Sequence, residues 1–267
     1  MKKKILTAVV LTAVLSLSAC GGKQTSNSSA NNANNANSTN SANAQSSSQA
    51  QSTTENNSSS VLQSSVESPA NNGSTVNVSD FSYKNDDGGI EITDSTNTDE
   101  NVIIPSEIDG KTVVSISNAN GTSKALFPNA KKITLPETLT EIDDYAFANC
   151  AALTEINIPS RVDDIGDCAF KGCKSLTEIV IPPSVEDIGD YAFEGCTNLS
   201  AVTFSNGTKE LGKGAFGGCT SLLNINLPDT LKELEQDTFD KNTAFTVTYK
   251  GISYTPDNIS ELYEKLR

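Results

Sequence analysis

The sequence predicts an α/β solenoid made mostly of short β-strands and short helical turns, because a 23-residue phrase is written five times over residues 136–250. Phenylalanine recurs at this step without a slip, and cysteine follows it by three residues in the first four copies. A period in the twenties is typical of proteins whose repeats form successive coils of one stack. The repeated positions are Phe147, Phe170, Phe193, Phe216 and Phe239, with Cys150, Cys173, Cys196 and Cys219.

Each copy contains a strand signal and a turn signal. Apolar residues alternate with polar ones near the end of the copy, as at Ile156 and Ile158, which is strand spacing. Gly166, Gly189 and Gly212 precede segments such as Asp-Tyr-Ala-Phe, where we expect a sharp bend and a single helical turn. One coil alone buries too little apolar surface to offset the entropy of ordering its backbone, so the coils must stack.

Residues 78–135 are expected to form an amino-terminal β cap and a degenerate first repeat. Short strands are predicted at residues 81–83, 90–93 and 102–104, with an Asp-Asp-Gly-Gly turn between the first two. Residues 108–116 are interpreted as an imperfect coil that is followed by an irregular insertion. Terminal repeats of a solenoid are atypical because one of their faces meets water.

Residues 251–267 are expected to complete a carboxyl-terminal cap. A hairpin is predicted around Lys250-Gly251, in which the last repeat strand runs one residue out of step with the earlier copies. Residues 256–267 then have apolar side chains on one helical face, with Asp257 as the expected N-cap. The alternative is that this amphipathic helix binds a partner instead of covering the stack.

The repeated phrase is specific enough to indicate a family. Residues 176–182 read Leu-Thr-Glu-Ile-Val-Ile-Pro, and Val185, Ile188-Gly189, Ala192-Phe193 and Gly195-Cys196 follow. This pattern resembles the BspA-type (treponemal) leucine-rich repeat. The resemblance implies a right-handed leucine-rich solenoid on an exported bacterial protein, often one associated with adhesion or with contact to a host or partner. Because this fold is a scaffold, its exposed residues decide what it binds.

Residues 1–19 are predicted to be a lipoprotein signal peptide. Three lysines precede an apolar run, Ile5–Leu17, that is too short to span a bilayer. Leu17-Ser18-Ala19-Cys20 resembles the lipobox of bacterial lipoproteins, which implies that Cys20 carries acyl chains such as palmitate and becomes the mature amino terminus. We therefore expect a repeat domain on the bacterial cell surface, attached to the membrane by lipid. The alternative is an ordinary signal peptide with an incidental Cys20.

Residues 20–77 are expected to be a disordered tether behind the lipidated cysteine. They consist almost entirely of Asn, Ser, Ala, Gln and Thr, so their apolar side chains cannot offset the cost of ordering the backbone. The whole chain has a formal net charge of −14. A protein this acidic repels phosphate backbones, and we expect no nucleic-acid partner.

The sequence gives no indication of an enzyme. It has no histidine, no phosphate-binding glycine loop and no nucleophile with an activating base, so neither catalysis nor a cofactor is predicted. The repeat cysteines recur once per coil with parallel side-chain directions, which favours buried thiols. A disulfide or a zinc site is the alternative for these cysteines.

Two rows of carboxylates also follow the repeat. We interpret them as a solvated convex edge and assign no metal site. Weak Ca²⁺ binding is the alternative, because stacked carboxylates repel one another and a divalent cation would relieve them. The longer row is Glu141, Asp164, Asp187, Glu210 and Glu233, and the shorter row beside it is Asp144, Asp167 and Asp190.

The outward strand positions are the candidate binding surface, although they lack the aromatic anchors of binding hot spots. We predict a membrane-anchored, non-enzymatic protein that binds an extracellular or host protein or glycan through this face. The alternative is a structural envelope spacer with no specific ligand. The candidate residues are Lys132, Glu155, Asn157, Glu178, Val180, Thr203, Asn224 and Asn226.

Overall fold

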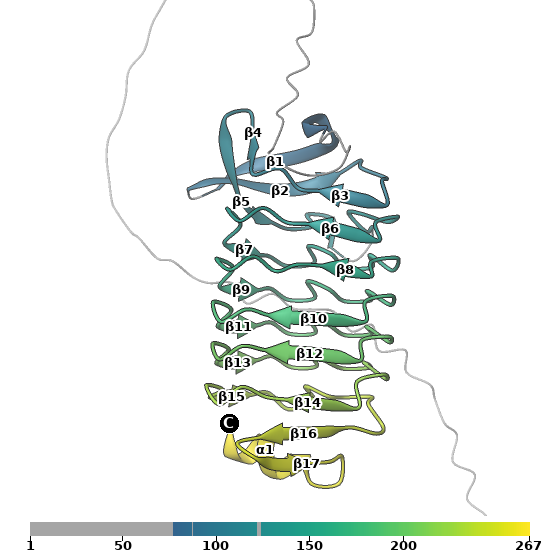
Figure 1. The fold of residues 1–267 in the computed structure, drawn as a ribbon, viewed down its shortest axis with the longest axis vertical. Helices are drawn as coiled ribbons and strands as arrows, with labels where there is room; N and C mark the ends of the chain where they lie inside the picture. Colours follow the sequence, from purple (N-terminus) through teal and green to yellow (C-terminus); the bar gives the residue numbers. More distant parts are fainter. Residues whose placement is uncertain (1–76, 87, 122–123) are drawn as a thin grey trace, which may run out of the picture.

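The computed structural model describes residues 77–86, 88–121 and 124–267. These residues form an elongated stack of coils, with the amino-terminal strands at one end and the carboxyl-terminal helix at the other (Figure 1). The predicted signal peptide, the lipidation site Cys20 and the tether up to residue 76 lie outside the described residues.

The strands form two columns that run along the stack (Figure 1). The first column contains β3 (Asn101–Ile103), β6 (Lys132–Thr134), β8 (Glu155–Ile156), β10 (Glu178–Ile181), β12 (Ala201–Phe204), β14 (Asn224–Asn226), β16 (Thr246–Tyr249) and β17 (Ile252–Tyr254). The second contains β5 (Lys111–Ile116), β7 (Glu141–Ile142), β9 (Asp164–Ile165), β11 (Asp187–Ile188), β13 (Glu210–Leu211) and β15 (Glu233–Leu234). From β5 to β15, neighbouring strands of this column pair in parallel and in register. Each coil therefore contains a second strand, which sequence analysis did not predict.

The predicted phenylalanine ladder stacks in the interior. Phe147, Phe170, Phe193 and Phe216 are fully buried, and successive ring centroids lie 5.2, 5.1 and 5.3 Å apart. Phe239 continues the row at 6.0 Å. Offset-stacked rings attract one another beyond the gain from burial. The constant sequence step has therefore become a continuous apolar column, as the repeat predicts.

The segment before each phenylalanine is a turn and not the helical turn that we expected. Tyr145, Cys168 and Tyr191 have positive φ angles of 58, 58 and 59°. A left-handed residue interrupts a right-handed helix, so the backbone cannot continue helically through this position. The helices that lie wholly within the described residues are the 3₁₀ turn Val78–Asp80 and α1 (Ile259–Lys265). The fold is a β-solenoid with little helix.

The repeat glycines are required by close packing and not by the sharp bend that we expected. Gly166 and Gly189 are not among the residues with positive φ. A Cβ atom on Gly166 would lie 2.7 Å from the backbone nitrogen of Asp144, and one on Gly189 would lie 2.8 Å from that of Asp167. Gly212 meets the preceding coil in the same way. Any side chain at these positions would push neighbouring coils apart.

The amino-terminal strands extend the second column. β1 (Phe81–Asp86) and β2 (Gly89–Ser95) form the predicted antiparallel hairpin, and Asp86 is the partner of Gly89. β4 (Glu107–Ile108) and β5 form a second antiparallel hairpin. Residues 108–116 are therefore not the simple imperfect coil that we expected, although β5 also pairs in parallel with β2 and β7.

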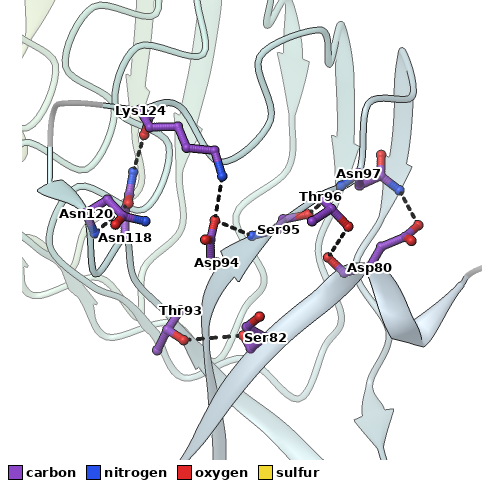
Figure 2. A network of polar contacts seen from close by, with 10 residues as sticks. All are labelled: Asp80, Ser82, Thr93, Asp94, Ser95, Thr96, Asn97, Asn118, Asn120 and Lys124. Carbon is purple, nitrogen blue, oxygen red and sulfur yellow. Dashed lines mark hydrogen bonds and ion pairs between the residues drawn. The ribbon is translucent and has the colours of Figure 1, made fainter.

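Polar side chains connect these strands to the loop that precedes the first repeat (Figure 2). The Lys124 ammonium lies 3.1 Å from a carboxylate oxygen of Asp94, and the Lys124 carbonyl oxygen accepts a hydrogen bond of 2.7 Å from Asn118. Nearby, the Asn97 amide donates to Asp80 at 3.4 Å. The contact between Lys124 and Asp94 joins residues that are 30 positions apart, so it connects the loop to β2.

The carboxyl-terminal elements lie at the other end of the stack (Figure 1). β16 and β17 form the predicted antiparallel hairpin, and Ile225 pairs with Val247, which confirms the slip of one residue in the last copy. The N-cap residue of α1 is Asn258 and not Asp257. The backbone nitrogen of Leu234 donates to the carbonyl oxygen of Leu266 at 3.0 Å, so the end of the helix lies against β15.

Candidate binding surface

The eight residues predicted to form the binding surface all lie on the outer face of the first column. All eight are exposed, because successive side chains of a strand point to opposite faces and their neighbours point inward. They are Lys132 on β6, Glu155 on β8, Asn157 immediately after β8, Glu178 and Val180 on β10, Thr203 on β12, and Asn224 and Asn226 on β14. Their role in binding stays a prediction.

The outer face of the first column changes in character along the stack. Near the amino-terminal end, the Lys132 ammonium lies 2.5 Å from a Glu155 carboxylate oxygen across β6 and β8. Further along, Val180 is in register with Thr203 and is 59% exposed. Asn157 is partly engaged, because its side-chain oxygen accepts a backbone hydrogen bond of 3.3 Å. The face therefore passes from a charged region to an uncharged one.

The longer carboxylate row lies on the second column. Glu141, Asp164 and Asp187 are in-register partners on adjacent strands, and Glu210 and Glu233 continue the row. The row is not fully solvated, since its first three side chains are half-buried. Burial, reinforced by the neighbouring charges of Glu141 and Asp187, raises the pKa of Asp164 to about 7.

The shorter carboxylate row has a structural role that sequence analysis missed. Asp144, Asp167 and Asp190 each accept a backbone hydrogen bond of 2.7 Å from the residue that is 23 positions further on. The donors are the backbone nitrogens of Asp167, Asp190 and Lys213. A carboxylate that accepts a backbone N–H bond from the next coil helps to hold the two coils together. This row is therefore not the solvated edge that we expected.

The repeat cysteines are buried free thiols, as the parallel ladder predicts. The sulfur atoms of Cys173, Cys196 and Cys219 each lie 3.2 Å from the carbonyl oxygen of a phenylalanine in the preceding coil. Burial raises the pKa of Cys150 to about 12, and it also raises the pKa of Cys173 and Cys219. A thiol that is not ionised is a poor nucleophile. The ladder is therefore part of the core and not a reactive site.

An ion-pair cluster on the turn side was not found by sequence analysis. Glu194 is nearly buried, and its two carboxylate oxygens lie 2.6 Å from the ammonium groups of Lys171 and Lys241. Burial alone would raise the pKa of Glu194, but the hydrogen bonds from the two lysines outweigh this effect and lower it. Lys241 is 47 residues from Glu194 and reaches it across the fourth coil, whose corresponding residues are Gly217 and Gly218.

Metal binding and membrane spanning find no support within the described ranges. In residues 77–86, 88–121 and 124–267, no three Cys, Asp or Glu side chains are grouped as metal ligands would be. In the same part of the chain, no helix is both long enough and apolar enough to cross a bilayer.

Comparisons with known proteins agree with this architecture. The profile described as "BspA type leucine rich repeat region" matches residues 125–246 in six copies. A leucine-rich repeat protein of T. pallidum, whose crystal structure is known, is 31% identical in sequence. The match covers 65% of this chain and 80% of the T. pallidum chain, with a TM-score of 0.60. The pneumococcal vaccine antigen PcpA shares the fold at 22% sequence identity. That match covers 73% of this chain and 55% of the PcpA chain, with a TM-score of 0.52. A search of curated protein sequences gave no match.

Proposed function

Because the chain belongs to the BspA-type leucine-rich repeat family, we propose that it is a bacterial surface protein that binds an extracellular or host protein or glycan without catalysing a reaction. The observation that supports this proposal is a contrast within each coil. Buried positions repeat the same side chain, as Phe and Cys do, or exchange mostly between apolar ones, whereas the outward positions of the first column differ in charge and polarity from one coil to the next. Stacked outward rows of this kind are the surfaces that solenoids use for binding.

The proposal includes an anchor and two covered ends. The Leu17–Cys20 motif supports cleavage after residue 19 and acylation of Cys20, with residues 20–77 as the tether. The amino-terminal strands within residues 78–135 and the hairpin and helix at residues 251–267 would shield the apolar ends of the five-copy stack from water. Radiolabelled palmitate should enter the wild-type chain in bacteria and not the Cys20→Ser variant; equal labelling of both would exclude this anchor.

The binding surface is tested by its charged residues. The chain carrying Cys20→Ser, which keeps it free of lipid, would be applied to an array of glycans and extracellular-matrix proteins. We expect specific retention, which Glu155→Lys or Glu178→Lys reduces at least tenfold. Glu233→Lys, which adds the same charge on the second column, is the matched control and should leave retention unchanged. Retention that survives both first-column substitutions would show that this face is not the binding surface.

A structural spacer is the second candidate function. It is favoured by the composition of the outer face, because the eight candidate residues include no aromatic side chain of the kind that anchors binding partners. If the protein is a spacer, no glycan or matrix protein on the array should retain it specifically. For a spacer, the length of the stack matters and its surface does not. Removal of one whole 23-residue coil should therefore change the phenotype of the cell more than any single substitution on the first column.

A further inference from the structure

Carboxylates are crowded where the amino-terminal strands meet the first coils. Glu141 on β7 is the in-register partner of Asp164 on β9, and Ser115 on β5 is the partner of Glu141 on its other side. Adjacent strands lie ~4.8 Å apart, a distance at which like charges repel strongly unless water screens them. We call this set of carboxylates the acidic interface; it consists of Glu141 and Asp164 with the groups whose charges act on Glu141, namely Asp86, Glu91, Asp143 and Asp163.

The acidic interface also includes the contacts that attach β1 and β2 to the stack. The Ser115 hydroxyl donates to a carboxylate oxygen of Asp86 at 2.8 Å, and the Ser117 hydroxyl donates to Glu91. Glu91 is buried, and its second oxygen lies 2.7 Å from the ammonium of Lys84. Repulsion within the set therefore acts on the contacts that join the two parts of the molecule.

The charge on the set is only partly neutralised. Among the described residues, Lys84 is the basic group that faces Asp143 and Glu91. The strand on the far side of Asp164, β11, adds the carboxylate of Asp187. Glu186, which directly precedes Asp187 in the sequence, already forms an ion pair with Lys209.

Half-burial and mutual repulsion both favour protonation here. Burial, followed by the charges of nearby carboxylates, raises the pKa of Glu141. Burial also raises the pKa of Asp143, although a backbone hydrogen bond and Lys84 partly oppose this effect. Asp164 has the largest shift of the three, from 3.8 to about 7. A proton shared within this set therefore stays bound at a pH at which an unfolded chain would have lost it.

We propose that the acidic interface is a proton-dependent joint, in which proton uptake by the Glu141–Asp164 pair tightens the attachment of the amino-terminal strands to the coils and proton loss loosens it. A folded-state pKa above the unfolded value means that the folded state binds more protons between the two values. Stability therefore falls as pH rises from about 4 to about 7 and is level above that. In mildly acidic surroundings the amino-terminal strands are held firmly, and at neutral pH they open more often.

Amide hydrogen exchange of the full chain tests this proposal. With intrinsic exchange rates corrected for, a single group that titrates near pH 7 changes an opening equilibrium by on the order of 30-fold between about pH 5.5 and about pH 8. We expect this increase in opening for amides of β2, which the proposal detaches from β5, and of β5, β7 and β9. In Asp164→Asn, which keeps the shape of the side chain and removes its charge, the pH difference should largely disappear. Glu141→Gln is a second variant; it removes one neighbouring charge but leaves Asp164 half-buried beside Asp187, so it should reduce the pH difference only in part.

The matched control is Glu233→Gln, which removes a charge from the same row at the far end of the stack. It should retain the wild-type pH dependence at β5, β7 and β9. If amides of these strands open equally often at both pH values, or if Asp164→Asn retains the full pH dependence, the proposal is wrong. If β13 and β15 show the same change as β5, the effect belongs to the whole molecule and not to this joint, and the proposal is also wrong.

Discussion

The interior of the coils and the outer face of the first column follow opposite rules. Inside, some positions keep one residue type, as in the phenylalanine column with ring spacings near 5.2 Å, and most others exchange only between apolar residues such as Ile, Leu and Val. Outside, Lys132, Glu155 and Glu178 occupy equivalent positions, and Ala201 and Asn224 replace them further along. The difference shows that the repeat period records the requirements of packing, whereas any specificity must come from residues that the period leaves free.

The largest expected effect is the loss of a ring from the interior column. Phe193→Ala removes a fully buried side chain that stacks on both neighbours. We expect the free energy of unfolding to fall by about 3–5 kcal/mol, because the ring leaves a cavity that the stiff coils cannot close. Denaturant unfolding measures this loss, and Val180→Ala on the outer face is the control that should change little.

The second effect concerns the glycines at which neighbouring coils touch. A Cβ atom on Gly189 would lie 2.6 Å from a carboxylate oxygen of Asp167 and 2.8 Å from two backbone atoms. We expect Gly189→Ala to destabilise the fold by about 1–3 kcal/mol through overpacking. Gly217→Ala is the matched control and should cost less, since its Cβ atom would lie no nearer than 3.1 Å to its neighbours and Ala148 occupies the equivalent position in the first copy. Equal losses in the two variants would contradict the packing explanation.

The third effect tests the carboxylates that accept hydrogen bonds from the next coil. Asp167→Ala leaves the backbone nitrogen of Asp190 without the acceptor that it contacts at 2.7 Å. An unsatisfied buried donor costs about 1–3 kcal/mol, so we expect a loss within that range. Asp167→Asn keeps an oxygen at the same position and should recover most of it. Thermal unfolding of both variants at one pH makes the comparison.

The smallest effect is expected on the outer face itself. The side chains of Lys132 and Glu155 are 47% and 65% exposed, so water screens their ion pair. We expect Lys132→Ala to change the free energy of unfolding by less than about 1 kcal/mol. A larger loss would mean that this face contributes to the stability of the stack, and the contrast with the interior would then be weaker than we infer.

Sequence reasoning predicted the interior well because buried side chains must repeat when coils stack in register. The phenylalanine and cysteine ladders, and the outward direction of residues such as Glu178, follow from that condition alone. The roles of Gly166 and Asp144 were missed, because each depends on the distance between two coils and not on the residue's own coil. A glycine that permits a bend and one that permits close contact look identical in a sequence.

The contact between Lys241 and Glu194 was missed for a related reason. Its partners are 47 residues apart, twice the repeat period and one more residue, so no ladder connects them. The exposure of the candidate binding residues follows from alternation, which fixes which side chains point outward, and their role in binding stays a prediction. Their ligand does not follow from alternation, because exposure alone carries no chemical preference.

Glu194 also has a mechanical consequence. It is held by Lys171 from the second copy and by Lys241 from the fifth, so these copies are connected by contacts that bypass the fourth. A pulling force applied at the carboxyl terminus must therefore break the Lys241–Glu194 ion pair before the fifth copy can separate from the third. We expect the last three copies to extend together in one long step and not in a series of equal short steps.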